Sequence, residues 1–282
     1  MDKINTIYIF SKGRPQCITA HTLSRIDYTG DWYIVIQEDE KFKDEYLENW
    51  GEDKIIPYDY YKYLSETELL DYFGDNFWWG ASPARNATIY LADSRNEKRF
   101  WFADDDIERF LYNGKTVTDG KFLEDMLFKI ADMSDKTDIE KIALKLDTTF
   151  PVDIRNLDYK AGVFFNCKTN TNLLYHGRVT DDVITSYLTY HSSYSNIEIE
   201  IATMKCKGAR VYDYEDRDNN EDRSGGNKEL YDKMNKLLTA SYILLVCPLV
   251  KIRIYDNNVD KMKHTNEFKN IRPMIINNKY KK

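Results

Sequence analysis

The sequence predicts an α/β fold in which helices cover both faces of a mostly parallel sheet. Two observations lead to this fold class. Short β-branched and aromatic runs alternate with helical segments through the first part of the 282-residue chain. Three polar clusters, at residues 11–14, 38–40 and 104–106, each follow directly after one of these runs. Ligands of such sheets bind beyond the carboxyl ends of the strands, so the clusters mark a candidate site.

The first four strands are recognised by apolar runs that turn-forming or acidic residues end. TIYIF is followed by a loop that contains Gly13 and Pro15, and WYIVI is followed by QEDE. RFWFA is closed by three aspartates. The expected strands cover residues 6–10, 32–36, 54–57 and 99–103, and the expected helices cover residues 17–26, 41–49, 60–73 and 84–92.

The second half of the chain has weaker periodicity. We expect helices at residues 122–133, 181–192 and 227–240 and β-like pieces within 142–166 and 197–204. Residues 241–254 could hold another strand or a buried helix turn. A charged loop is expected at 214–226, and the last ~20 residues could form a polar tail or lid. Residues 1–202 are predicted to form the core domain. Residues 203–282 are predicted to form a C-terminal segment packed on it.

The charge is divided unevenly between these two parts. Residues 203–282 hold 17 Lys and Arg against 11 Asp and Glu, whereas residues 1–202 hold 23 against 36. A basic segment beside an acidic body suits a polyanionic partner. A solvated Lys-rich tail would give the same composition.

Compartment and membrane signals are absent from the sequence. The four cysteines have no CxxC spacing, which argues against a zinc ribbon or a disulfide framework and favours a reducing cytoplasm. The first ten residues read as a strand rather than a signal peptide. The longest apolar run, at residues 240–250, is too short to span a bilayer. We expect no membrane span and no obligate protein partner.

The aspartates at 104–106 are the strongest chemical signal. Three carboxylates at the end of one apolar strand repel one another unless a cation or donor groups neutralise them. Mg²⁺ accepts one or two carboxylates together with phosphate oxygens, so a D-x-D arrangement suits a metal that bridges a nucleotide diphosphate. The alternative is an acidic cap on a helix formed by IERFLY.

Three weaker signals accompany the aspartates. Gly13 lets the backbone approach a nucleotide, and flanking basic side chains can meet phosphate, although a simple turn explains the segment equally well. Arg85 and Asn86 begin a helix from which they could reach a phosphate, base or sugar, or stay exposed. Asp181 and Asp182 open another helix, as a general base or as capping acids. The histidines at 176, 191 and 264 lack metal-ligand spacing.

Taken in order, IYIFSKGR, IVIQEDE, GASPARN and FWFADDDIERF resemble the donor half of a GT-A-type glycosyltransferase. The closest likeness is to the phage glycosyltransferases associated with TET/JBP hydroxylases, which add sugars to hydroxymethylated pyrimidines in DNA. The resemblance covers residues 7–110 well and the remainder loosely. It implies a GT-A-like single domain with a C-terminal acceptor-side extension, located in the cytoplasm of a phage-infected bacterium.

The resemblance also implies a nucleotide-sugar donor, commonly UDP-linked, and Mg²⁺ or Mn²⁺. The metal would lie at Asp104 and Asp106, and the base would be Asp182 or its neighbour Asp181 if the reaction inverts. The residues implied around the nucleotide are Ser11, Lys12, Gly13, Arg14, Glu38, Arg85, Asn86, Asp104 and Asp105. The residues expected at the acceptor are Arg217, Arg223, Gly225, Gly226 and Lys228. Modified DNA is the expected acceptor, with a glycan or protein acceptor, or nucleotide binding without transfer, as alternatives.

Overall fold

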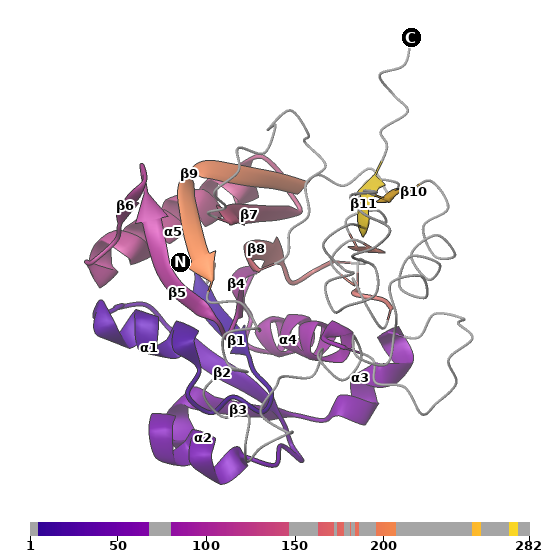
Figure 1. Ribbon diagram of the computed structural model, residues 1–282. Helices are drawn as coiled ribbons and strands as arrows, with labels where there is room; N and C mark the ends of the chain where they lie inside the picture. Colours follow the sequence, from indigo (N-terminus) through magenta and orange to yellow (C-terminus); the bar gives the residue numbers. More distant parts are fainter. Residues whose placement is uncertain are drawn as a thin grey trace, which may run out of the picture.

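A computed structural model describes residues 5–67, 80–146, 163–171, 174–177, 181, 184–185, 196–206, 250–254 and 271–275. Its main body is a twisted sheet with helices on both faces (Figure 1). Within the described residues, this sheet has nine strands in the order β3-β2-β1-β4-β8-β7-β9-β5-β6. The α/β class predicted from the sequence is thus confirmed.

The first half of the sheet is parallel. It comprises β1 (Thr6–Phe10), β2 (Trp32–Gln37), β3 (Ile55–Tyr58) and β4 (Arg99–Asp104). Both β2 and β4 pair with β1 in parallel, and β3 pairs with β2. All four strands match the segments expected from their apolar runs.

The helices also follow the expected segments. They are α1 (Ile18–Arg25), α2 (Lys43–Trp50), the short 3₁₀ helix η1 (Glu52–Lys54), α3 (Tyr60–Thr67), α4 (Ser82–Ser94) and α5 (Gly120–Lys136). Asp119 caps α5 by accepting the Phe122 N–H at 3.0 Å. None of the helices in the described part of the chain is long and apolar enough to cross a membrane.

Alternate residues of the parallel strands enter two separate cores, which is why these strands are apolar on both sides. Ile7 and Trp101 face the core beneath α1, α2 and α5. Tyr8 and Phe102 face the core beneath α4. Burial on both faces leaves the carboxyl ends of the strands as the place where polar side chains can gather.

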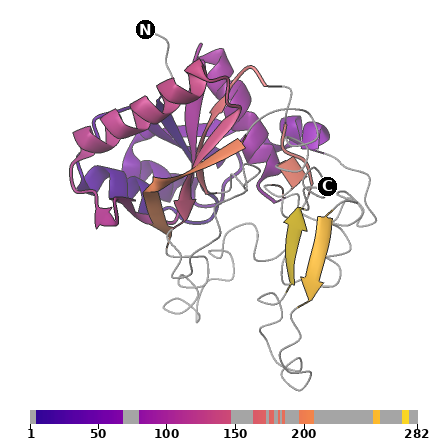
Figure 2. The same ribbon diagram turned by 90° about the horizontal axis from the view of Figure 1, so that it is seen from above.

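The second half of the sheet is mostly antiparallel. It comprises β5 (Ile107–Tyr112), β6 (Lys115–Thr116), β7 (Lys141–Leu146), β8 (Phe164–Lys168) and β9 (Asn196–Cys206). β9 pairs with both β7 and β5, so the sheet continues past the predicted domain boundary at residue 202. β10 (Val250–Ile254) and β11 (Ile271–Ile275) pair with each other outside this sheet (Figure 2).

Two local features add to the sequence-based expectations. IERFLY, for which a capped helix was the alternative, forms strand β5, since its Ile and Phe are buried in the sheet core. Within the polar C-terminal stretch, Ile271–Ile275 forms a strand that pairs with β10. The predicted loop at 214–226 and helix at 227–240 lie outside the described residues, as does most of the helix expected from residue 181.

Candidate active site

The candidate site lies at the carboxyl ends of β1, β2 and β4. β2 and β3 extend the sheet on one side of β1, and β4 extends it on the other, so the crevice between β1 and β4 is a topological switch point. The polar clusters at residues 11–14, 38–40 and 104–106 all follow these strands. The structure therefore brings together the three clusters that the sequence singled out. We call this the site edge of the sheet.

The loop after β1 is fixed to the elements beside it. Gly13 has φ 67°, a left-handed conformation that favours glycine, and its N–H donates to Oε2 of Glu40 at 3.3 Å. The hydroxyl of Tyr46 accepts the Arg14 N–H at 3.0 Å and shares a 2.7 Å hydrogen bond with Oγ of Ser11. The sequence reasoning missed Glu40 and Tyr46 as loop anchors. The acidic cluster was a signal for Glu40, but nothing in the sequence pointed to Tyr46.

Asp105 lies inward from the site edge and is 1% exposed. Ser11 Oγ donates to Asp105 Oδ2 at 2.5 Å, and Nη2 of Arg14 lies 2.6 Å from Asp105 Oδ1. Burial raises the pKa of Asp105 to about 6, although the charge of Arg14 opposes the shift. The three residues were expected around the nucleotide. In this structure they bond to one another and tie the first loop to the turn after β4.

Asp104 and Asp106 have a different environment from Asp105. Burial raises the pKa of Asp104 well above its usual range, and Arg85 opposes that shift with its Nη2 at 3.8 Å from Asp104 Oδ1. Oδ1 of Asp104 and Oδ1 of Asp106 are buried, and neither accepts a hydrogen bond from the described residues. Two such oxygens on one turn fit a hard divalent cation that takes its remaining ligands from a diphosphate or water. No group of three potential metal-ligating side chains occurs among the described residues, so the protein itself offers an incomplete shell.

Arg85 connects the donor-side acids with Asp181. The side chain is 5% exposed, and its guanidinium carbon lies 5.0–5.4 Å from the ring centroids of Phe10, Phe102 and Tyr175. Its Nε lies 3.2 Å from Asp181 Oδ2. Burial disfavours the charge on Arg85, but Asp181 and Asp104 outweigh it and raise the pKa of the guanidinium. Arg85 is therefore a cation held between two carboxylates and three aromatic rings.

Asn86 faces the protein rather than the crevice. Its Nδ2 donates to the Tyr175 carbonyl at 3.0 Å, and its Oδ1 accepts the Tyr175 N–H at 2.7 Å. Ser82 Oγ donates to the Gly177 carbonyl at 2.8 Å. The fully buried amide thus clamps residues 174–177 onto α4, which corrects the expectation that Asn86 contacts a base or sugar.

Comparison with known proteins gives this geometry its context. The family model described as TET-Associated Glycosyltransferase matches residues 5–193, more than half of the chain. The chain belongs to the TET-associated glycosyltransferase family. The glycosyltransferase family and the α/β architecture predicted from the sequence are confirmed at this level.

Similar solved structures are more distant. A fragment of S. aureus TarS is 11% identical with a TM-score of 0.45, and the match covers 73% of this chain and 60% of that fragment. A cytidylyltransferase from Leptospira borgpetersenii is 10% identical with a TM-score of 0.38, covering 71% of this chain and 76% of the other. The chain spans about 60% of the length of the TarS fragment. A comparison with curated proteins returned no match.

Two further residues expected around the donor of this TET-associated glycosyltransferase lie near the same edge. Lys12 is half-buried in the loop after β1. Glu38 is exposed and lines a hollow of about 420 Å³ between α3 and α4. Tyr58, Tyr63 and Tyr90 also line this hollow, and the rings of Tyr63 and Tyr90 stack at 5.5 Å.

The acceptor-side residues expected for this family member are mostly not described. The candidate base Asp182 and the predicted acceptor residues Arg217, Arg223, Gly225, Gly226 and Lys228 lie outside the described residues, as do His191 and His264. His176 is described, and burial lowers the pKa of its imidazole. Asp181 is thus the one predicted acceptor-side residue that the described part of the structure places at the site.

Proposed function

We propose that the protein transfers a sugar from a UDP-sugar to the hydroxyl of a hydroxymethylated pyrimidine in DNA, with the help of Mg²⁺ or Mn²⁺. The observation that carries the proposal is the pair of buried carboxylate oxygens on Asp104 and Asp106, without hydrogen-bond donors among the described residues, at the switch point of the sheet. A divalent cation and a diphosphate would together complete this site.

In donor binding, some residues of the site edge would hold the cation and others would keep the surrounding loops in place. When bound, the cation would take up negative charge on the diphosphate as the glycosidic bond breaks. Asp104 and Asp106 would hold it, while Ser11, Arg14 and Asp105 keep the loop and the turn in place. Lys12 and Glu38 remain candidates for contact with the nucleotide.

Asp181 and Asp182 are not equally suited to act as the general base. Asp181 lies 3.2 Å from Nε of Arg85, so its carboxylate is held in an ion pair with the guanidinium. We infer that Asp181 orients the site and that Asp182, the adjacent residue, is the general base if the reaction inverts. A retaining reaction would need no such base.

The acceptor assignment rests on family membership and on the basic C-terminal segment. Lys and Arg exceed Asp and Glu in residues 203–282, which favours a polyanionic partner over a neutral glycan. An acceptor base must be extruded from a duplex or presented on a single strand. We propose that the reaction takes place in the cytoplasm of an infected bacterium.

The first experiment measures donor binding by thermal shift. UDP with Mn²⁺ is expected to raise the unfolding temperature, and the increase should disappear in EDTA or in Asp104→Asn. AMP with Mn²⁺ is the matched nucleotide control. The absence of a shift with every nucleoside diphosphate would overturn the donor assignment.

The second experiment measures transfer from a panel of radiolabelled UDP-sugars to 5-hydroxymethylpyrimidine DNA. The variant Arg217→Ala/Arg223→Ala/Lys228→Ala is expected to raise the KM for DNA and to leave donor hydrolysis nearly unchanged, because phosphate contacts supply affinity without chemistry. Transfer to a phosphate-free glycan but never to DNA would replace the acceptor assignment with a polysaccharide.

A further inference from the structure

A second hollow, of about 650 Å³, lies between α1 and the β5–β6 hairpin. We call it the α1–β5 groove. None of its lining residues belongs to the set expected around the donor. Its polar and charged lining includes His21, Arg25, Glu108, Arg109, Thr116 and Thr118.

The groove is basic on an acidic body. Two arginines and one glutamate line it, whereas residues 1–202 as a whole hold 36 acidic against 23 basic residues. Arg25 is exposed, and its Nη2 donates to the Glu108 carbonyl at 2.8 Å. This bond uses one of the five N–H groups of the guanidinium, and none of the described residues is seen to accept from the others, which an anion could therefore meet.

Arg109 lines the same groove from β5 and brings a second guanidinium to it. Its Nε is buried and has no hydrogen-bond partner in the described part of the structure. The register of β5 against β9 shifts between Ile107 and Arg109, and Ile107 and Phe110 both enter the same core. Such a bulge re-aims side chains locally, and bulges are common beside active sites.

One end of the groove adjoins the aspartate turn. Ile18 lines the groove, and the next residue, Thr19, donates from Oγ1 to the Asp104 carbonyl at 2.5 Å and from its N–H to the Asp105 carbonyl at 3.1 Å. Thr19 Oγ1 also accepts the Ile107 N–H at 2.9 Å. A polymer in the groove would therefore run from the turn that carries Asp104 and Asp106 along α1 and β5.

We propose that the α1–β5 groove binds the phosphate backbone of the DNA acceptor, which rests on the proposed function but uses residues outside the donor site. The eight residues of α1 extend ~12 Å, about the length of three or four phosphates along one strand of a duplex. The lining contains no Phe, Tyr or Trp on which a sugar ring or base could stack. Guanidinium and hydroxyl groups without a stacking platform match phosphates, and they would bind without reading sequence.

The test is fluorescence anisotropy with a labelled 5-hydroxymethylcytosine oligonucleotide, single-stranded and duplex, over a range of salt. Arg25→Ala/Arg109→Ala is expected to weaken binding about tenfold or more at low salt, and to reduce the slope of log K against log salt by about 1.5. Arg25→Lys/Arg109→Lys should retain most of the affinity because phosphate accepts either cation.

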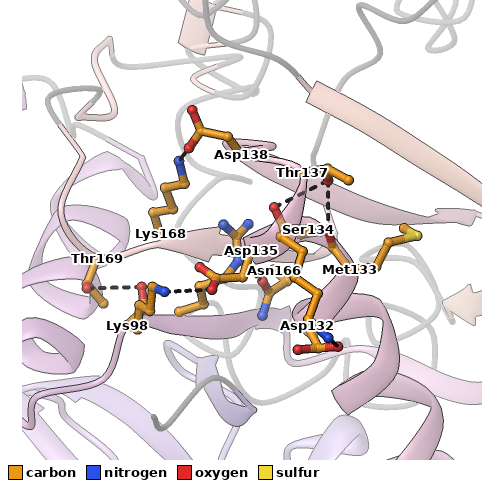
Figure 3. Close-up of polar contacts among 12 residues, drawn as sticks. Lys98, Asp132, Met133, Ser134, Asp135, Thr137, Asp138, Asn166, Lys168 and Thr169 are labelled. Atoms are coloured by element: carbon orange, nitrogen blue, oxygen red, sulfur yellow. Dashed lines mark hydrogen bonds and ion pairs between the residues drawn. The ribbon is translucent and has the colours of Figure 1, made fainter.

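The matched control is Lys98→Ala/Lys168→Ala, which removes the same charge at the opposite edge of the sheet (Figure 3). It is expected to leave DNA affinity and salt slope unchanged. Parental DNA binding by Arg25→Ala/Arg109→Ala would overturn the inference, as would an equal loss in the control or competition by a phosphate-free glycan. The UDP–Mn²⁺ thermal shift, measured on the same variants, should persist throughout, so failure of the groove and failure of the donor assignment are distinguishable.

Discussion

Charged residues gather at both edges of the sheet, but the two edges use them differently. At the site edge, Asp105 and Arg85 are buried, Asp104 is partly buried, and Arg85 pairs with both Asp104 and Asp181. At the opposite edge, where β4 begins, Lys98 pairs with Asp135 at 2.6 Å, and Lys168 pairs with Asp138 (Figure 3). Those pairs are partly or fully exposed to water. Burial and the sharing of Arg85 by two carboxylates, rather than the number of charges, therefore distinguish the site edge.

The strongest way to break the site edge is to remove its candidate metal ligands. Asp106→Ala and Asp104→Asn are each expected to reduce transfer by about a thousandfold or more, ~4 kcal/mol, because the diphosphate loses its counter-charge. Initial rates with Mn²⁺ measure the loss, and circular dichroism checks that the fold is kept. Undiminished transfer by the parent in EDTA would contradict the metal assignment.

The next largest effect is expected from Arg85→Ala. Its removal leaves Asp104 and Asp181 facing each other in a buried place without a cation, so the free energy of unfolding should fall by about 3–5 kcal/mol. Arg85→Lys should recover only part of the lost free energy of unfolding, because an ammonium cannot reach both carboxylates as a planar guanidinium does. Urea denaturation measures both variants. A loss below about 1 kcal/mol for Arg85→Ala would show that the ion pairs of Arg85 contribute little to stability.

A smaller change in the free energy of unfolding, and one of opposite sign, is expected from the removal of Lys141 on β7. Its Nζ is buried, has no hydrogen-bond partner among the described residues, and lies 4.2 Å from the ring centroid of Tyr175. Burial lowers the pKa of the amine from 10.5 to about 8. Lys141→Met should therefore raise the free energy of unfolding at pH 7 by about 2–3 kcal/mol.

The sign of the pH dependence at Lys141 follows from linkage. Between pH 8 and 10.5 the unfolded amine binds a proton that the folded amine has released, so the stability of the parent should rise with pH across this window. Lys141→Met should lose that rise. Urea midpoints at pH 7, 8.5 and 10 measure it, and a variant whose stability climbs as steeply as the parent's would refute the assignment.

The smallest effect is expected at the opposite edge. Lys98→Ala/Lys168→Ala should leave the urea midpoint and the transfer rate within experimental error of the parent, since exposed ion pairs contribute little. The Asp106→Ala and Arg85→Ala measurements, repeated in this background, should give the same losses. A substantial change in the double variant would remove the contrast between the two edges.

Most of the donor half could be predicted from local patterns. The alternation of apolar runs with helices gave β1 to β4 and α1 to α4 close to their observed bounds. Each polar cluster followed a strand, so a parallel arrangement was enough to bring residues 11–14, 38–40 and 104–106 to one edge. The family resemblance rested on the same segments, and the family match covers them.

The partners of the site residues depended on contacts between distant segments. Tyr46 on α2 anchors Ser11, and Asn86 on α4 clamps Tyr175, 89 positions away. The hydrophobic pattern of a single segment does not determine which hydroxyl or amide it contributes will bond to a distant part of the chain. IERFLY likewise resembled a capped helix locally, but pairing with β9, about 90 residues further along, made it a strand.

The sequence by itself determined the fold class, the strands that end in polar clusters and the presence of three adjacent aspartates, because these are consequences of local composition and period. Only the tertiary structure separated the roles of those aspartates. Asp105 turns inward to Ser11 and Arg14, whereas Asp104 and Asp106 keep oxygens without donors among the described residues. The reason is that Asp105 and Asp106 lie in the turn after β4, where the side chains that each aspartate meets come from elsewhere in the chain.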